Sequence, residues 1–439
     1  MSSRKMLNLL LEWQKRILNV QGIQRECEDI LMGAMNSKPI KIVTGFRRSG
    51  KSFLVQRIAK KMVENGSVKL QNILYLNFED FHFMEINDPY KLDEIYMLYK
   101  GEIANEGKKL LIFDEIQSVK DWDRFIRTIY EQNDNIEILL TGSNSELLSS
   151  ELGSNLAGRF IELQIFPFNF KEYLTFNAIS FATEQDFLRN SEQIRKSFSD
   201  FVKYGGMPET FSISTEHARY SYLEGILSKV ILDDIIKRFG VKNSFALERI
   251  LLYLYSAIGN NISFNRITQF CKQLGINLKS ETTITYIQHI IKTFALYEVS
   301  KFDWKLNKIF STSRKYYAID TGFINFASVV DNNYSKQLEN IVFIHLKQRS
   351  KKIYFGELSN GKEIDFIAET RDGRRTKYQV TVKLHEDNYD RELSPFSFGN
   401  EHIKREENIL LSMESEEKEI LYNDIIIKKR NLLRWLLDL

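Results

Sequence analysis

Four short apolar runs recur in the first 175 residues, and helix-length segments separate them. Each run is apolar at consecutive rather than alternating positions, as strands buried on both faces are. The segments between them are long enough for crossover helices, so the pattern predicts an α/β fold with a parallel sheet. The predicted strands are residues 40–43, 73–78, 110–113 and 136–141.

Beyond this sheet the hydrophobic period becomes that of helices. Residues 176–240 read as helical, with a break at 205–208, where two glycines and a proline disfavour a continuous helix. Residues 245–293 predict three helices, capped in two cases by Ser263 and Ser280, and a β-hairpin follows through 297–299 and 316–319. Three helices and a hairpin are typical of a winged helix.

The tail predicts a third α/β unit. A helix over 338–349 precedes three β-type runs, KIYFGE, EIDFIAE and KYQVTV, and the turn 371–374 joins the last two.

Composition narrows the class of protein without naming a function. The chain has 439 residues, 43% of them hydrophobic, and only 5 prolines, so it should be folded almost throughout. Its formal net charge is only +3, so a nucleic-acid surface would have to be a local basic patch. Cys27 and Cys271 fit neither a disulfide framework nor a metal site, which favours a reducing, cytoplasmic location.

No apolar run is long enough to predict a membrane span. The N-terminal stretch reads as an amphipathic helix, and we expect Leu7, Leu10 and Leu11 to face the core or a neighbouring subunit rather than a membrane.

A phosphate-binding loop is the strongest motif. Residues 45–52, GFRRSGKS, match G-x-x-x-x-G-K-[ST] between a predicted strand and a predicted helix. Backbone N–H groups of such a loop bind phosphate oxygens, while Lys51 should reach the β- and γ-phosphates of ATP and Ser52 should bind Mg²⁺. The predicted nucleotide-binding residues are Gly45, Phe46, Arg47, Arg48, Ser49, Gly50, Lys51, Ser52 and Phe53.

Two carboxylates end the strand 110–113, at the sheet edge where phosphoryl chemistry occurs. We expect Asp114 to hold Mg²⁺ and Glu115 to orient or deprotonate the attacking water. After the next strand, either Ser143 or Asn144 could sense the γ-phosphate, although a plain turn would read the same. Arg159 is a candidate arginine finger, a cation that stabilises the transition state and often comes from another chain. A surface ion pair is nearly as good an interpretation of this residue. The pair Glu79 and Asp80 reads mainly as a loop cap.

These segments together resemble the bacterial and archaeal AAA-type ATPases in which the ATPase core precedes a C-terminal domain of unknown function. The resemblance rests on TGFRRSGKS, LNFED, LLIFDEIQSVKDW, LLTGSNSELLS, LAGRF, PFNFKEY, YGGMPE and KYYAIDTGF. It implies a P-loop NTPase core of the AAA type, Mg-ATP binding with hydrolysis, a winged helix, and a C-terminal fold similar to PD-(D/E)xK restriction endonucleases. It implies no particular substrate.

The expected organisation is five segments. They are a helical lead-in (1–35), the P-loop core (36–175), a helical lid (176–240), a winged helix (241–325) and a nuclease-like domain (326–439).

The nuclease motif is incomplete. Asp365 fits the first acid and Glu339 a helix acid, but the acid-x-lysine step reads Gln379-Val380-Thr381. Lys383 shares the face of Gln379 and Thr381, yet each step of two residues moves it about 6.6 Å along a strand, too far to substitute. We therefore expect a degenerate domain used for interaction.

Partners and activity stay open at this point. The third helix of the winged segment and its wing could contact phosphates of duplex DNA, or pack against protein instead; the polar residues concerned are Thr282, Thr285, Gln288, His289, Lys292, Lys301, Lys305, Lys308, Arg314 and Lys315. A finger supplied in trans would imply a homo-oligomer. The leading hypothesis is an ATP-hydrolysing switch or remodelling motor. The alternatives are an ATP-regulated DNA nuclease and a nucleotide-gated protein-binding module, defensive or regulatory, without turnover.

Overall fold

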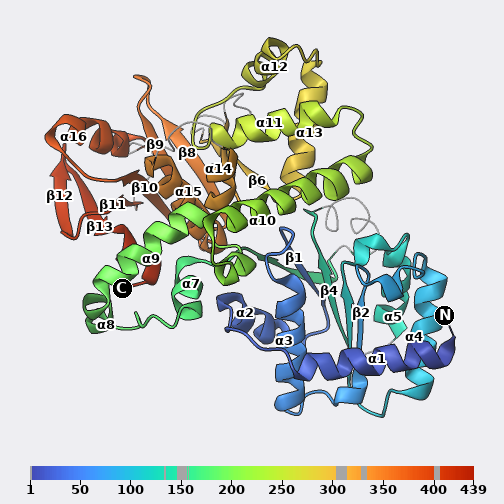
Figure 1. Ribbon diagram of the computed structural model, residues 1–439. Helices are drawn as coiled ribbons and strands as arrows, with labels where there is room; N and C mark the ends of the chain where they lie inside the picture. Colours follow the sequence, from blue (N-terminus) through green and yellow to red (C-terminus); the bar gives the residue numbers. More distant parts are fainter. Residues whose placement is uncertain are drawn as a thin grey trace. The chain divides into compact units, whose positions relative to one another are not determined.

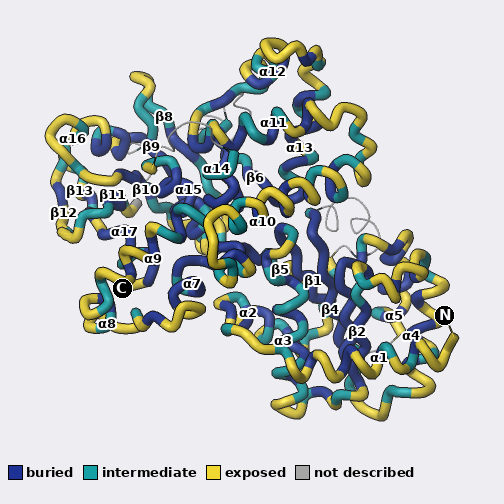
Figure 2. The backbone as a smooth tube through the Cα atoms, viewed as in Figure 1, coloured by how far each residue is buried: buried dark blue, intermediate teal, exposed yellow. Residues whose placement is uncertain are grey.

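The computed structural model describes residues 2–132, 135–145, 156, 158–302, 314–327, 334–399 and 406–439 (Figure 1). It contains two compact units. The N-terminal unit is Met1–Phe166 with Lys292–Phe294, and the C-terminal unit is Pro167–Ile291 with Ala295–Leu439. In the N-terminal unit, the central strands of the sheet are buried along most of their length (Figure 2).

The N-terminal unit is built on a five-stranded parallel sheet in the order β2-β3-β4-β1-β5. The four predicted strands are confirmed, whereas β5 was not predicted. It is an edge strand whose sequence, FIELQI, mixes polar and apolar positions because much of it is only partly buried. The strands are β1 (Ile40–Gly45), β2 (Ile73–Asn77), β3 (Lys109–Asp114), β4 (Ile136–Gly142) and β5 (Phe160–Ile165).

The helices of this unit pack against the sheet through apolar faces. They are α1 (Ser3–Leu18), α2 (Glu26–Ala34), α3 (Lys51–Glu64), α4 (Pro89–Glu102) and α5 (Trp122–Gln132), with single turns at η1 (Leu70–Asn72), η2 (Phe81–Phe83) and η3 (Ile116–Ser118).

Helix α1 buries one face, as predicted, but only part of the predicted set lies on it. Leu10 is buried and Leu7 is half-buried, whereas Leu11 is exposed. The helical period explains the difference, because the buried positions recur every three or four residues as Met6, Leu10, Trp13 and Ile17. Trp13 stacks on Tyr75 of β2, with ring centroids 4.8 Å apart.

Strand order fixes where the polar strand ends meet. Because all five strands are parallel, their carboxyl ends share one edge, and β4 lies between β1 and β3. The residues after β4 therefore lie between the loop after β1 and the carboxylates that end β3.

The C-terminal unit begins with helices, as predicted, and these surround the break at 205–208. They are α7 (Phe170–Phe176), α8 (Glu184–Arg189), α9 (Ser191–Tyr204), η5 (Pro208–Ser212) and α10 (Glu216–Lys229), continued by a π-helical stretch, η6 (Val230–Lys237).

Three further helices and a hairpin follow, again as predicted: α11 (Ser244–Ser256), α12 (Phe264–Gln273), α13 (Ser280–Lys292), β6 (Leu296–Lys301) and β7 (Arg314–Ala318). Ser263 caps α12 by accepting a hydrogen bond from the Arg266 backbone N–H. Ser280 is instead the first residue of α13.

The hairpin is part of an eight-stranded mixed sheet in the order β12-β13-β11-β10-β9-β8-β6-β7. Helix α15 precedes an antiparallel run of three strands, and β11 then pairs parallel with β10 after α16. The remaining elements are α14 (Thr321–Ala327), α15 (Tyr334–Arg349), β8 (Lys352–Glu357), β9 (Glu363–Glu369), β10 (Arg375–Thr381), α16 (Glu386–Leu393), η7 (Ser394–Ser397), β11 (Glu406–Ser412), β12 (Lys418–Tyr422), β13 (Ile425–Asn431) and α17 (Leu432–Leu437).

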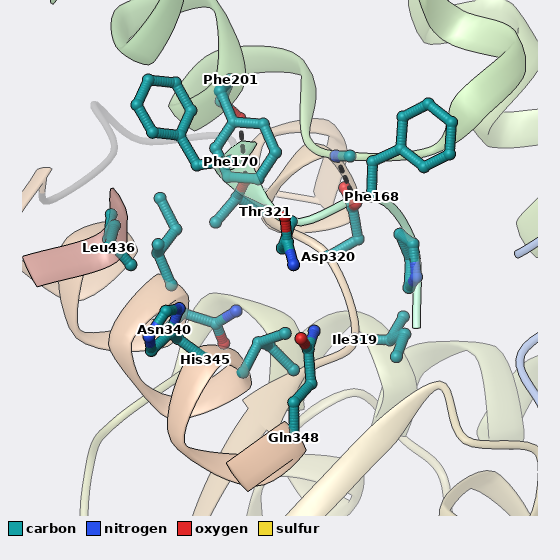
Figure 3. A pocket seen from close by; sticks show the side chains of 15 residues that line it. Phe168, Phe170, Phe201, Ile319, Asp320, Thr321, Asn340, His345, Gln348 and Leu436 are labelled. Atoms are coloured by element: carbon teal, nitrogen blue, oxygen red, sulfur yellow. Dashed lines mark hydrogen bonds between the residues drawn. The ribbon is translucent and has the colours of Figure 1, made fainter. Parts of the chain in front are cut away.

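A buried carboxylate, Asp320, ties the glycine break to this sheet (Figure 3). It accepts hydrogen bonds from the backbone N–H of Gly206 at 2.6 Å and of Gly322 at 2.8 Å. A Cβ on Gly205 would lie 1.6 Å from the Asp320 carboxylate, so only glycine fits there.

Burial raises the pKa of Asp320 to about 6, although the two N–H donors oppose that rise. A cavity of about 30 Å³ beside it, lined also by Asn340 and His345, has room for about one or two waters.

Candidate nucleotide site

The phosphate loop has the backbone that its glycines predict. Gly45 has φ +150° and Gly50 has φ +97°, both in the region that favours glycine. A Cβ on Gly45 would lie 2.4 Å from the Ile165 carbonyl oxygen. Gly50 is the N-cap of α3, so the positive end of that helix faces the loop. The loop is closed internally by Ser49, whose hydroxyl donates to the Phe46 carbonyl at 2.8 Å.

Lys51 points back over the loop and meets the end of β3. Its Nζ donates to the carbonyl oxygens of Gly45 and Phe46, both at 3.2 Å, and lies 3.1 Å from Glu115 Oε1. Both side chains are buried, so this ion pair is poorly screened by water. The lysine and the glutamate, far apart in the sequence, share one site.

Asp114 ends β3 as a fully buried carboxylate held by hydroxyl groups. Tyr75 donates to its Oδ2 at 2.5 Å, the Thr141 hydroxyl donates to Oδ1, and the Ser52 hydroxyl also hydrogen-bonds to it. Burial, and then the neighbouring charge of Glu115, raise the pKa of Asp114 against these bonds. A carboxylate and a hydroxyl in contact suit a Mg²⁺ ion that takes its other ligands from phosphate and water. Across the described parts of the chain, no three His, Cys, Asp or Glu side chains gather as a metal site.

Glu115 follows in a left-handed backbone conformation, φ +58°, which is costly for a residue with a Cβ. The Glu115 backbone N–H donates a hydrogen bond to the Thr141 hydroxyl oxygen at 2.9 Å, and this bond holds the conformation. Burial would raise the pKa of Glu115, but the Lys51 ammonium and a hydrogen bond from Gln117 outweigh it, so the pKa lies below its usual value. The carboxylate is therefore ionised at neutral pH.

The end of β4 also reaches Glu115. Ser143 and Asn144 are both buried, and the Ser143 backbone N–H donates to Glu115 Oε2 at 3.1 Å. Gln117 Nε2 donates to the same Oε2 and lies 3.4 Å from the Ser143 hydroxyl. Within the described residues, the buried Gln117 Oε1 accepts no hydrogen bond. This amide oxygen is thus a buried acceptor with its hydrogen-bonding capacity unused.

Arg159 lies at the other edge of the same sheet. In the parallel pair β1 and β5, Ile40 is opposite Phe160, so Arg159 is at the amino edge and Gly45 at the carboxyl edge. Six-residue strands separate those edges by roughly 16 Å. Arg159 forms an ion pair with Glu131 at 3.3 Å, and its side chain is partly exposed. It therefore cannot reach the phosphate loop of its own chain.

The other charged residues near the loop pair with one another. Arg47 and Glu79 form an ion pair at 2.6 Å. Asp80 accepts a hydrogen bond from the His82 backbone N–H at 3.0 Å, which confirms the predicted loop cap.

Four residues of this site were not predicted. Tyr75 and Thr141 hold Asp114, Gln117 holds Glu115, and Arg25 donates to the carbonyl oxygens of Ser49 and Phe166. Gln117 is the one that the sequence could have given, because it follows the two carboxylates by a single turn. Thr141 lies in the quoted segment LLTGSNSELLS, just before the sensor candidates, whereas Tyr75 and Arg25 come from distant segments.

Comparison with known proteins agrees with this geometry. Residues 37–174 match the AAA domain, and residues 195–334 match a domain of unknown function. An uncharacterised protein of Haemophilus influenzae is 31% identical over 334 residues, which cover 76% of this chain and 80% of that protein. The chain belongs to its family. The family extends to an archaeal relative, an uncharacterised protein of Methanocaldococcus jannaschii, 29% identical over 88% of this chain and 82% of its own length.

Among solved structures, the Walker-type ATPase of Pyrococcus abyssi resembles this chain with 14% identity and a TM-score of 0.39, over 69% of this chain and 95% of that one. No helix in the described residues is long and apolar enough to cross a membrane.

The predicted nuclease residues meet in the C-terminal unit. Gln379 Oε1 accepts a hydrogen bond from the Asp365 backbone N–H at 3.2 Å, and Asp365 Oδ2 accepts from the Val380 N–H at 2.9 Å. The Thr381 hydroxyl donates to the Lys383 carbonyl, and Lys383 itself is exposed. One cation reaches both acids: Lys315 Nζ lies 3.7 Å from Glu339 Oε1 and 4.0 Å from Asp365 Oδ1.

The expectation of phosphate contacts by Lys315 is therefore wrong. Its side chain is only 1% exposed, because it points from β7 into the interior. Two other basic residues of the predicted wing also pair with acids, Lys301 with Glu357 and Arg314 with Glu298, both at 2.7 Å. Lys305 and Lys308 lie outside the described residues.

The polar residues predicted on the third helix differ in exposure. Thr285 and Gln288 are exposed, while Thr282, His289 and Lys292 are partly buried. The His289 ring stacks on Phe239, with centroids 4.0 Å apart.

Proposed function

We propose that this protein binds Mg-ATP, hydrolyses it, and uses the cycle as a molecular switch. The observation that carries the proposal is the 3.1 Å pair between Lys51 and Glu115, which joins the phosphate loop to a carboxylate placed to act on water. The AAA domain supports nucleotide binding, and the carboxylate adds hydrolysis.

Each residue has a definite task in this proposal. The loop N–H groups bind phosphate oxygens, and Lys51 neutralises the β- and γ-phosphates. Ser52 and Asp114 would hold Mg²⁺, which supplies charge neutralisation at the phosphate oxygens when bound.

Glu115 orients the attacking water and accepts one of its protons, while Gln117 performs two tasks beside it. Its Nε2 fixes the Glu115 carboxylate, and its Oε1 accepts the second water O–H. The attack needs both acceptors because a water with one loose O–H samples unproductive orientations.

The switch depends on Lys51, whose ammonium group cannot pair closely with Glu115 and with a γ-phosphate at the same time. When a γ-phosphate attracts the ammonium group, Glu115 loses its ion pair with Lys51. The change then passes to Ser143 through the 3.1 Å hydrogen bond from the Ser143 N–H to the Glu115 carboxylate. Arg159 serves the nucleotide site of a neighbouring chain in a homo-oligomer, since it is too far from its own.

Measuring phosphate release with and without duplex DNA tests whether the C-terminal unit binds DNA or a protein. We expect turnover that is indifferent to DNA and a protein partner for the C-terminal unit, because the described basic residues of the wing are paired with acids. Stimulation by DNA would contradict this choice of partner and favour a DNA-acting motor. Tight ATP binding without phosphate release would favour a nucleotide-gated binding module instead.

A further inference from the structure

Five charged side chains gather inside the C-terminal unit, and the proposed ATPase cycle uses none of them. They are Lys315 on β7, Lys336 and Glu339 on α15, and Glu363 and Asp365 on β9. Lys315 lies among the three acids, 2.8 Å from Glu363, 3.7 Å from Glu339 and 4.0 Å from Asp365. All five side chains are at least two-thirds buried, and Lys315 is almost completely enclosed.

The Glu339 carboxylate in this cluster also receives hydrogen bonds from two further side chains. Lys336 donates to Glu339 Oε2 at 2.9 Å, and the Tyr317 hydroxyl donates to Glu339 Oε1 at 2.7 Å. Burial, and then the charge of Glu339, raise the pKa of Asp365 to about 7, so this acid is partly neutral near physiological pH. Two lysines thus lie against three acidic side chains.

The neighbouring strand β10 places a neutral side chain, Gln379, beside Asp365. Gln379 presents an amide oxygen, already used by the Asp365 N–H, where a nuclease would present a carboxylate. A divalent ion at this point would need two or more free carboxylate oxygens at about 2.0–2.6 Å. The spacing and the charge of the cluster suit an ammonium group instead.

We propose that Lys315 is a built-in cation that takes the place of a divalent metal in this cluster. The acids then hold β7, α15 and β9 together without a metal, and the C-terminal unit has no metal-dependent nuclease activity. Removal of the ammonium leaves uncompensated carboxylates around a vacated space, which is a latent site for a divalent cation.

The test is a thermal unfolding series on the full chain without nucleotide, with and without Mn²⁺, for the wild type and Lys315→Ala. We expect Lys315→Ala to unfold at a lower temperature than the wild type and to recover by roughly 5 °C when Mn²⁺ is about 100-fold above its dissociation constant. We expect no such recovery in the wild type. The phosphate loop is the same in both proteins, so the difference reports on the C-terminal unit.

Two further variants separate a cation site from a general loss of packing. Lys336→Ala removes the outer, partly exposed ammonium and should gain no response to Mn²⁺. Lys315→Ala with Asp365→Asn should lose the response of the single variant. If Lys315→Ala does not fold without metal, its soluble yield on refolding should rise with Mn²⁺ and not with K⁺.

Two results would overturn the proposal. One is a Lys315→Ala protein, or its refolding yield, that is indifferent to Mn²⁺. The other is a wild type that binds one Mn²⁺ and loses it on Asp365→Asn, since a metal site would then exist with the lysine in place.

Discussion

Replacing Gln117 with alanine tests the most specific part of the proposed chemistry. The change removes the Nε2 donor to Glu115 and the open Oε1 acceptor, and it leaves the phosphate loop intact. A hydrogen bond to a charged group is worth about 1.5–3 kcal/mol, which corresponds to a fall in kcat of about 10- to 150-fold. KM for ATP should change little, because the hydrogen bonds of the Gln117 side chain go to Glu115 and Ser143 rather than to the phosphate loop.

The assay is steady-state phosphate release, combined with binding of a fluorescent ATP analogue. Ser118→Ala is the matched control, because Ser118 lies in the same turn but is exposed. Gln117→Glu should be slower than Gln117→Ala, since it sets a second carboxylate against Glu115. A Gln117→Ala enzyme with kcat within about twofold of the wild type would refute the role, as would a loss confined to KM.

Three further outcomes are expected. Gly45→Ala should abolish binding of the ATP analogue, since its Cβ would lie 2.4 Å from the Ile165 oxygen at φ +150°; wild-type affinity would show that the loop adapts. Arg159→Ala should lose turnover alone and regain part of it when mixed with Lys51→Ala protein, since each variant supplies what the other lacks; a full rate at every protein concentration would mean that Arg159 is only a surface ion-pair residue. Asp320 has a raised pKa in the folded state, from 3.8 to about 6, so the folded protein binds its proton more tightly than the unfolded chain. Its contribution to stability is thus greatest below about pH 4 and falls by about 3 kcal/mol as pH rises to 6 and above. Denaturant unfolding of Asp320→Asn should lack that fall, and an unchanged pH dependence would contradict it.

The nucleotide site was readable from sequence where its residues are consecutive. The loop 45–52 and the pair Asp114 and Glu115 each combine a local motif with a flanking strand, and parallel pairing brings their ends to one edge. Tyr75 and Arg25 could not be found in this way, because only the folded chain brings them to Asp114 and Ser49.

Lys315 shows why the C-terminal unit was harder to predict. A lysine at the start of a strand beside other basic residues suggests a surface patch, and nothing in the local pattern reveals that acids from α15 and β9 enclose it. Likewise, the hydrophobic pattern of the π-helical stretch Val230–Lys237 does not differ from that of an ordinary α-helix. The edge strand β5 lacks the pattern that would separate a strand from a loop.

Glu115→Gln tests the central claim most directly, because it keeps the shape of the side chain and removes its charge. Steady-state phosphate release and ATP-analogue binding should be measured for the wild type, Glu115→Gln and Lys51→Ala. The account predicts turnover by the wild type, a fall of at least about 100-fold with nucleotide binding retained in Glu115→Gln, and loss of binding in Lys51→Ala. A Glu115→Gln protein that hydrolyses ATP at the wild-type rate would contradict it.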